Sequence, residues 1–419
     1  MAPVQKLTKK EVGLSNRPWI SFGILTSMKQ RDKLYKEFTQ EKSSTKKVEI
    51  FESYKKLRNE IIKLIRISKK DYFTKYFEEN RSNVKKTWVG IRNLINVNKK
   101  SKTKINKLVL NGKTIEDGMG VANAMNNYFV NIGSSIDAKI PKSNSTFQSY
   151  MGERNGLGFH VLEVSQTDIL EIIKKMHRGK ASGPFSIPTQ ILKDYGHLLV
   201  DPLQCIINKS LREGIFPALL KSARVCPIFK KGDQQNCGNY RPISLLSNLS
   251  KIFERIYFNQ LEHFLNVNDI IYDLQFGFRK KYSTNHALLS IVEQIRNSLD
   301  KGYFACGVFV DLEKAFDTVN HNILLSKLDH YGVRGRANDW IKSYLSNRDQ
   351  YVNLNDCTSS KNTTKCGVPQ GSILGPLLFI IYINDMNKAI KDCITHHFAD
   401  DTNLLYAHKD PKMIKKNSK

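Results

Sequence analysis

The residues with the clearest chemical potential are two adjacent carboxylates, Asp400 and Asp401. Short strand-like stretches at 394–399 and 402–407 flank the pair, so a tight turn between two strands would carry both acids. Hard divalent cations such as Mg²⁺ bind carboxylate oxygens and tolerate two acids side by side. Adjacent aspartates are also common in solvated turns, so this pair alone does not distinguish a metal site from an ordinary turn.

A third acid, Asp311, lies within the end of an apolar run that predicts a buried strand at Tyr303–Leu312. Burying a carboxylate is costly unless a cation or hydrogen-bond donors compensate, and nearby Lys314 would supply a structural salt bridge. Alternatively, Asp311 joins Asp400 and Asp401. Such a three-acid cluster holds two Mg²⁺ ions in enzymes that transfer phosphoryl groups.

The charge of the chain suggests what such a site would act on. The chain has 419 residues, of which 40% are hydrophobic and 10% aromatic, as in globular proteins. Its formal net charge is +27, and residues 1–100 hold 25 Lys and Arg against 10 Asp and Glu. This uneven excess indicates a polyanionic partner, most simply nucleic acid, because each phosphate that Lys or Arg neutralises releases counterions.

The cysteines and apolar segments bear on localisation. Seven cysteines occur singly, with no Cys-x-x-Cys pair, which is typical of reduced thiols in a nuclear or cytoplasmic protein. Cys393, His396 and His397 form a local group, but ordinary packing is favoured over zinc because no cysteine pair accompanies them. The run Ile373–Ile383 is too short to span a bilayer. We therefore expect neither secretion nor membrane insertion.

The positioning elements are predicted from hydrophobic periodicity. Apolar residues recur at helical spacing from Phe51 to Phe77, which predicts a long basic helix or a helical hairpin. Ser165 and Asp168 form a capping box that opens another helix, and Pro227 favours an edge position for a strand at Val225–Phe229. The overall pattern predicts an α+β fold with helices packed on a small antiparallel sheet.

We expect five regions along the chain. They are a basic, loosely ordered arm (1–48), a basic helical connector (49–135), a linker (136–164), the main α+β region (165–407) and a basic tail (408–419).

Seven motifs follow one another in the second half of the sequence. They are Lys180–Pro184, Phe216–Pro217 with Val225–Asp233, Asn239–Leu246, Gln275–Arg279, Val310–Asp317, Gly367–Pro376 and Phe398–Asp401. In this order, over roughly residues 165–407, the series resembles the reverse transcriptase of non-LTR retrotransposons (LINE elements) of the jockey-like group. One motif departs from the family, which often has Gly-Pro-Asp-Gly-Ile where this chain has Phe185 and Ser186 after Pro184.

The resemblance implies the fingers and palm of a right-hand polymerase, with an antiparallel palm sheet and a basic helical region before it. Asp311, Asp400 and Asp401 match the catalytic acids of the family. Asp311 and Asp400 would be the main ligands of two Mg²⁺ ions, for which Mn²⁺ could substitute. Asp401 would bind weakly or orient the others, and the carbonyl of Leu312 would complete a metal shell.

The resemblance also implies a nucleotide pocket. Phe316 occupies the position at which an aromatic ring selects deoxynucleotides by excluding a 2′-hydroxyl. Gln370 and Gly371 would line the pocket. The basic residues that hold the triphosphate would be Arg241 with Lys230 or Lys231, and the sequence leaves the choice between the two lysines open.

Further implied contacts involve nucleic acid. Gln275, Gly277 and Arg279 would lie along the template path. The expected partners are an RNA template, a DNA primer and deoxynucleoside triphosphates, in a retrotransposon ribonucleoprotein of the nucleus or cytoplasm, with an unknown oligomeric state.

The ends of the sequence suggest a fragment, cut at both ends and missing the family's endonuclease and thumb. Two functions therefore remain open at this stage: an RNA-directed DNA polymerase, or a catalytically inactive truncated fragment that only binds nucleic acid. A polymerase that makes RNA is a weaker third interpretation.

Overall fold

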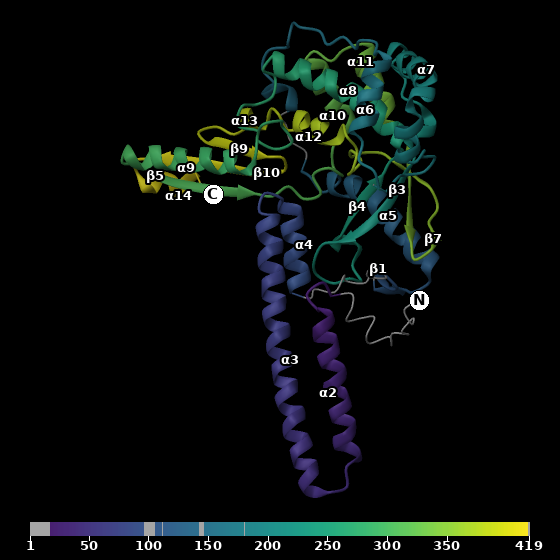
Figure 1. Cartoon of the computed structure of the whole chain (residues 1–419). Coiled ribbons are helices and arrows are strands. Elements are labelled where there is room, and N and C mark those ends of the chain that lie inside the picture. The colour runs from purple at the N-terminus through teal and green to yellow at the C-terminus, as the bar shows by residue number, and fades with distance from the viewer. Residues whose placement is uncertain (1–16, 96–104, 111, 142–145, 180, 418–419) are drawn as a thin grey trace. The chain divides into compact units, whose positions relative to one another are not determined.

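The computed structural model in Figure 1 describes residues 17–95, 105–110, 112–141, 146–179 and 181–417. The chain forms two compact units, Met1–Thr103 and Lys104–Lys419. Because the boundary falls at 103/104, the segment 105–135, which the sequence analysis grouped with the basic connector, belongs to the larger unit. Lys180 of the first motif lies outside the described residues.

The smaller unit is helical, with α2 (Phe22–Gln40), α3 (Ser44–Glu79) and α4 (Val84–Leu94). Helices α2 and α3 form a long hairpin (Figure 1), in which the rings of Phe38 and Phe51 lie 5.0 Å apart. The expected loosely ordered arm at 1–48 is therefore wrong for residues 22–40. Helix α2 has weak periodicity of its own, and its aromatic side chains are stabilised by packing on α3.

The larger unit mixes helices and strands. Its helices are α5 (Gly118–Asp137), α6 (Gln166–Lys175), α7 (Thr189–Glu213), α8 (Asn248–Val267), α9 (Thr284–Asp300), α10 (His321–His330), α11 (Arg336–Leu345), α12 (Gly375–Tyr382), α13 (Met386–Ala389) and α14 (Pro411–Asn417). Three short 3-10 helices are η1 (Phe147–Tyr150), η2 (Ala218–Lys221) and η3 (Cys237–Asn239). The predicted capping box is present, since Ser165 and Asp168 cap each other's backbone at the start of α6.

The strands of the described residues form three sheets. They are β1 (Leu108–Leu110), β2 (Lys113–Ile115), β3 (Ala223–Phe229), β4 (Tyr240–Leu245), β5 (Phe304–Val310), β6 (Arg348–Leu354), β7 (Cys357–Thr358), β8 (Asn362–Thr364), β9 (Ile394–Phe398) and β10 (Asp401–His408). Strands β1 and β2 pair alone, β5-β10-β9 form a three-stranded sheet, and β4-β3-β6-β7 with β8 on β6 form a five-stranded sheet.

The five-stranded sheet is mostly antiparallel, but β3 runs parallel to β6 over Ala223–Val225. Strand β3 also pairs with β4 along most of its length, and Pro227 lies opposite Pro242 beyond the contact with β6. The edge position predicted for this strand therefore holds only around Pro227, where no ladder hydrogen bond to β6 is lost. Helix α5 covers this sheet with Val121, Met125 and Phe129.

The three-stranded sheet is antiparallel and lies beside α9 (Figure 1). The prediction of a buried strand at Tyr303–Leu312 is wrong in one respect. Strand β5 is at the edge of the sheet, and Phe304 and Phe309 are 53% and 74% exposed. The apolar run indicated a strand correctly, but its burial depends on neighbours that sequence does not reveal.

The main core lies among α6, α7, α8, α10, α11 and α12. Its centre is aromatic: Trp340 stacks on Tyr257 with ring centroids 4.3 Å apart, and Phe216 meets Trp340 edge-on at 5.2 Å. Ala315 and Val319 are buried in the same core. The segment that follows β5 is thereby anchored in the main core.

Candidate active site

Strands β9 and β10 form the hairpin predicted around Asp400 and Asp401. Asp401 pairs with Phe398, so the turn consists of Ala399 and Asp400. Ala399 has a φ of 58°, the left-handed conformation that suits the first position of a two-residue hairpin turn. The hairpin therefore presents Asp400 in its turn and Asp401 as the first residue of β10.

The neighbouring strand brings the third acid to the same place. Val310 of β5 pairs with Thr402 of β10, so one further residue along the ladder sets Asp311 opposite Asp401. The pKa of Asp401 is raised by partial burial, and further by the charges of Asp400 and Asp311. The three predicted acids are thus brought together and repel one another, while Asp311 and Asp401 remain exposed to solvent.

These carboxylates are hard oxygen donors whose mutual repulsion a divalent cation would relieve, so their chemistry fits Mg²⁺. Within the described ranges, however, no three or more histidine, cysteine or acidic side chains are already arranged to hold a metal ion. Leu312, the predicted carbonyl ligand, is half-buried with its side chain against the main core.

Phe316 packs against the main core between two other aromatic side chains. Its ring stacks on Phe379 of α12 at 4.9 Å and meets Phe278 edge-on at 5.9 Å. Its carbonyl accepts a hydrogen bond from the amide of Val368 at 2.8 Å. The ring is half-buried and held on two sides, so its position is set by the core.

Gln370 bonds a residue that the sequence analysis did not single out. Its Nε2 donates to Oδ2 of Asp317 at 2.8 Å, and its carbonyl accepts from the amide of Ser244 in β4 at 2.7 Å. Burial raises the pKa of Asp317 to about 6, against the lowering effects of Gln370 and Lys314. The presence of Asp317 at the end of the Val310–Asp317 motif was the available sequence signal.

Gly371 lies close to the backbone of β4. Its φ is 122°, and a Cβ there would lie 2.6 Å from the carbonyl oxygen of Ser244. A side chain would therefore clash with β4. The close backbone approach that this glycine permits is to the five-stranded sheet.

The predicted triphosphate-binding cations lie at the β3–β4 hairpin. Arg241 pairs with Ile228, and the amide of Lys230 bonds the carbonyl of Asn239 at 2.9 Å. Lys314, which the sequence analysis treated only as an ion-pair partner, donates from Nζ to the carbonyl of Gly238 at 3.0 Å.

The charges of these residues act on one another. Burial lowers the pKa of Lys314, Lys230 and Arg241 lower it further, and Asp317 and Glu313 oppose the change. Lys230, Arg241 and Lys314 are therefore close enough to form one cationic group. Lys231 is not among the charges that act on Lys314.

Gln275, Gly277 and Arg279, the predicted template contacts, lie against the acidic hairpin. The Oε1 atom of Gln275 accepts from the amide of Ala399 at 3.1 Å. Nη1 of Arg279 donates to the carbonyls of Tyr272 and Gln275, and its guanidinium lies 4.4 Å from the ring centroid of Tyr282. The polar groups of Gln275 and Arg279 are thus engaged within the protein.

Glu254 was missed entirely. It is fully buried in α8, and its Oε2 accepts from the amides of Ile373 and Leu374 at 2.7 and 3.3 Å. Its Oε1 accepts from the hydroxyl of Ser250 at 2.9 Å. The only sequence signal was an acid on the apolar face of a helix. Glu254 holds the loop that carries Gln370 to the main core.

The two histidines of β9 are packed as ordinary polar side chains. His396 contacts the hydroxyl of Ser290 at 3.1 Å, and Nδ1 of His397 contacts that of Thr402 at 3.0 Å. Burial lowers the pKa of both, that of His397 to about 4, so both rings are neutral near pH 7. The other ring nitrogens, Nδ1 of His396 and Nε2 of His397, are buried without a hydrogen-bond partner.

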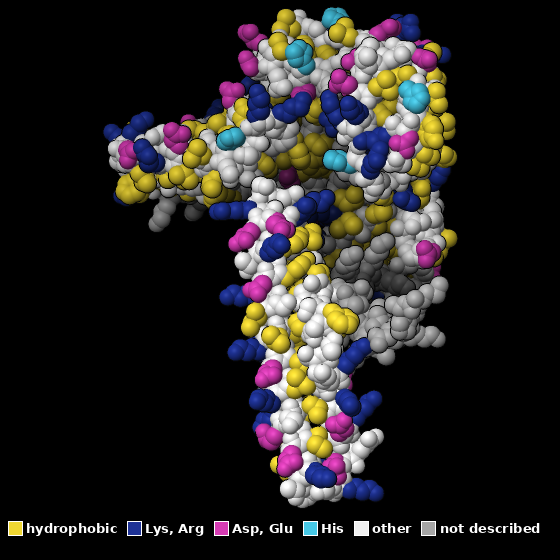
Figure 2. Space-filling view, viewed as in Figure 1, with side chains coloured by type: hydrophobic (Ala, Val, Ile, Leu, Met, Phe, Trp, Pro, Cys, Tyr) yellow, Lys and Arg dark blue, Asp and Glu magenta, His cyan; other side chains and the backbone are white. Residues whose placement is uncertain are grey.

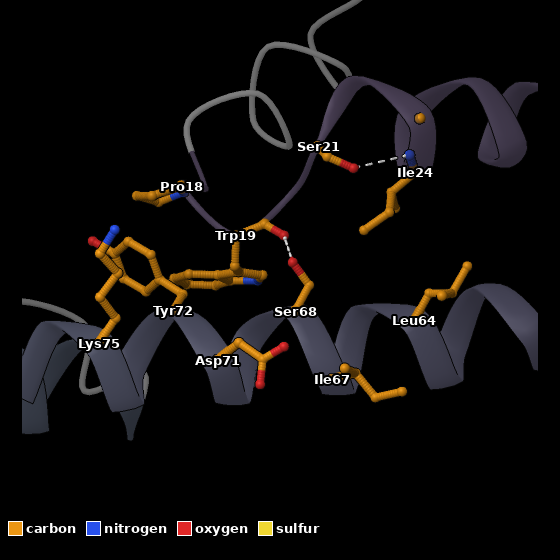
Figure 3. A pocket seen from close by; sticks show the side chains of 11 residues that line it. Pro18, Trp19, Ser21, Ile24, Leu64, Ile67, Ser68, Asp71, Tyr72 and Lys75 are labelled. Carbon is orange, nitrogen blue, oxygen red and sulfur yellow. Dashed lines mark hydrogen bonds between the residues drawn. The ribbon is translucent and has the colours of Figure 1, made fainter.

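A separate groove of about 610 Å³ lies in the smaller unit, between α3 and the segment before α2 (Figure 3). Trp19 lies over α3, with its carbonyl accepting from the hydroxyl of Ser68 at 2.6 Å. Asp71 and Lys75 are the charged residues that line it. The groove therefore lacks a group of acids comparable with Asp311, Asp400 and Asp401.

Figure 2 shows Lys and Arg side chains on the visible face of both units, interspersed with Asp and Glu along the helical hairpin. None of the helices in the described part of the chain combines the length and apolar character needed to cross a membrane.

Comparison with known proteins identifies the motif-bearing region. Residues 228–417 match the family described as reverse transcriptase (RNA-dependent DNA polymerase), and this range contains all the site residues predicted from the sequence, including the three acids. The chain is 34% identical over 254 residues to the probable RNA-directed DNA polymerase from transposon BS of Drosophila melanogaster. That alignment covers 57% of this chain and 27% of the relative.

Two further relatives are RNA-directed DNA polymerases from the mobile element jockey. The Drosophila melanogaster protein is 32% identical over 254 residues, covering 59% of this chain and 28% of the relative. The Drosophila funebris protein is 33% identical over 250 residues, covering 58% of this chain and 27% of the relative. The matched region thus spans only about a quarter of the length of these relatives.

Proposed function

We propose that this chain catalyses RNA-directed DNA synthesis for a non-LTR retrotransposon, because residues 228–417 match the reverse transcriptase family and the chain is similar to polymerases of jockey-type mobile elements. It would add deoxynucleotides to a primer 3′-hydroxyl on an RNA template and release pyrophosphate. The observation that supports this most directly is the pairing of Val310 with Thr402, which brings Asp311 to the end of β10 where Asp401 and Asp400 lie.

In this proposal Asp311 and Asp400 are the main ligands of Mg²⁺, with Mn²⁺ as a substitute. Asp401 is a weaker ligand or orients the others, and the carbonyl of Leu312 contributes to one shell. Two bound metal ions would lower the pKa of the primer hydroxyl and neutralise charge on the leaving phosphates. The exposure of Asp311 and Asp401 leaves both carboxylates accessible to such ions.

The cationic group would bind the triphosphate. The charges of Lys230 and Arg241 act on Lys314, so an arriving polyanion would relieve the repulsion at Lys314. Arg offers a planar donor pair for phosphate oxygens, and Lys a mobile point charge. We choose Lys230 over Lys231 as the triphosphate contact, because only Lys230 belongs to this group.

The walls of the pocket would set sugar selectivity. Phe316 is held by Phe379 and Phe278, so its ring cannot move freely away from a 2′-hydroxyl. Gln370 and Gly371 would support the nucleotide from the other side, with their loop tied to β4 through Ser244. Positioning of this kind supplies much of the rate in phosphoryl transfer.

We assign the β3–β4 part of the five-stranded sheet to the fingers and the β5-β10-β9 sheet to the palm. The basic smaller unit would serve as a connector that contacts nucleic acid, since its Lys and Arg exceed its acids. Gln275, Gly277 and Arg279 keep their proposed place near the template path. The protein would act within a ribonucleoprotein of the nucleus or cytoplasm.

Primer extension on poly(rA)/oligo(dT) with Mg²⁺ tests the proposal. The chain should incorporate deoxythymidine, and Asp400→Ala should abolish incorporation. Asp300→Ala, which removes an exposed acid at the end of α9, should leave it intact. Extension that survives Asp400→Ala would contradict the assignment of the acids.

The alternative is a chain that binds nucleic acid without catalysis. Its signature would be RNA binding that weakens steeply with salt, measured by filter binding, together with no incorporation at any Mg²⁺ or Mn²⁺ concentration.

A further inference from the structure

The segment Tyr272–Arg279 is attached to the strand that leads into the acidic turn. The amide of Phe276 donates to the carbonyl of His397 at 2.8 Å, and the amide of His397 donates to the carbonyl of Leu274 at 2.9 Å. The hydroxyl of Tyr272 donates to the carbonyl of Thr395 at 3.0 Å. This segment therefore lies along β9 as a short parallel neighbour.

The side chain of Gln275 extends this attachment to the turn itself. Its Oε1 accepts from the amides of Ala399 and Gly277, at 3.1 and 2.8 Å. Gln275 and Ala399 are only 3% and 5% exposed. Loss of the amide oxygen would leave two amides without this partner in a largely buried setting, where water replaces it poorly.

The backbone around these bonds shows why the turn needs support. Ala399 adopts a φ of 58°, which is unfavourable for a residue with a Cβ. A Cβ on Gly277 would lie 2.1 Å from the nitrogen of Ala399, so a glycine is needed for the two segments to meet.

We infer that Gln275 is a positioning residue, which holds Ala399 in its turn conformation and thereby fixes the place of Asp400. The expected effect on catalysis rests on the proposed polymerase function. The contact between Gln275 and the turn does not depend on that function. Gln275 acts through the backbone of the turn, so its role is independent of any contact with the template.

The contact is tested by hydrogen exchange. Gln275→Met keeps the size of the side chain and removes the acceptor, so the amide of Ala399 should exchange about 10 to 100 times faster. Gln350→Met is the matched control, since Gln350 is another buried glutamine, 9% exposed, whose amide bonds Asn126 and not the hairpin. It should leave exchange at Ala399 unchanged. Equal exchange in Gln275→Met and the parent chain would overturn the inference.

The consequence is tested by steady-state primer extension. Gln275→Met should lower kcat on the order of tenfold and leave the KM for deoxynucleotide within about twofold, because the cationic group is on another sheet. If the parent chain has no polymerase activity, the proposed function is refuted. The hydrogen-exchange result then still tests whether Gln275 holds the turn at Ala399. Faster exchange with an unchanged kcat would overturn the positioning role.

Gly277→Ala changes another residue that lies against Ala399. It is the replacement test if Gln275→Met does not fold. It should also speed exchange at Ala399 and lower kcat, since its Cβ would displace the turn. Parental exchange and kcat in this variant would count against the inference.

Discussion

The acids of the candidate site lie on the three-stranded sheet, whereas Phe316, Gln370 and Gly371 are held by the main core and the five-stranded sheet. On the first side, Asp311 and Asp401 are exposed and the turn depends on a few bonds from one segment. On the second side, the loop is held by Glu254, Ser244 and aromatic packing. Under the proposed function, this difference would keep the catalytic carboxylates accessible and the nucleotide pocket rigid.

The largest expected effect is on the acidic side. Asp311→Asn should reduce primer extension by about 1,000-fold, because losing one metal-binding charge removes roughly 4 kcal/mol of transition-state stabilisation. Its free energy of unfolding should change by less than about 0.5 kcal/mol, since the side chain is exposed. Extension assays and urea unfolding on the same preparation measure both. A large loss of stability in Asp311→Asn would contradict the difference between the exposed acids and the tightly held pocket.

The acidic side was also the part most accessible to sequence reasoning. The hairpin at 394–407 and the order of the three acids follow from local patterns, because two-residue turns and strand periodicity are encoded within a few residues. The exposure of β5 was not predicted, since an apolar run does not show which neighbours cover it. The apolar stretch predicts a strand, and only the fold decides its burial.

The supporting contacts were largely beyond prediction. Glu254 meets residues more than a hundred positions away, and Gln275 meets Ala399 across a similar separation. Each is a polar residue whose partner is a backbone amide, and an amide has no sequence signature. Helix α7 likewise continues through Pro202, a residue that would ordinarily end a helix. Long-range packing overrode the local helix-breaking preference of proline there.

On the core side, Asp317→Asn should raise stability. Burial holds the pKa of Asp317 at about 6, above the ordinary 3.8, so the folded state binds this proton more tightly than the unfolded state. Stability therefore falls as the pH rises from about 4 to about 6, and the loss is complete above that range. The difference of about 2.2 pKa units corresponds to about 3 kcal/mol.

Urea unfolding at two pH values measures this effect. The gain in Asp317→Asn should approach about 3 kcal/mol at pH 7 and vanish near pH 3.5, where the carboxyl is protonated in both states. An equal gain at both pH values would show that burial of the charge is not the cause.

A smaller effect is expected at Glu254. Glu254→Gln keeps one oxygen for the amides of Ile373 and Leu374 but loses the negative charge that strengthens those bonds, so unfolding should cost about 1–2 kcal/mol less. Glu293→Gln, on the exposed surface of α9, is the matched control and should change stability by less than about 0.5 kcal/mol. Thermal and urea unfolding measure both variants. A Glu254→Gln chain as stable as the control would mean that the loop is not held by this charge.

The smallest effect separates two adjacent lysines. Lys230 acts on Lys314 and Lys231 does not, although both are exposed at the end of β3. Lys230→Ala should therefore raise the KM for deoxynucleotide about tenfold, roughly 1.4 kcal/mol of binding, while Lys231→Ala should change it by less than about twofold. Neither variant should alter exchange at Ala399, because the cations and the acidic turn are held by different sheets. Steady-state primer extension shows which of the two variants has the larger KM. A larger increase in Lys231→Ala than in Lys230→Ala would place the triphosphate away from Lys314 and Arg241.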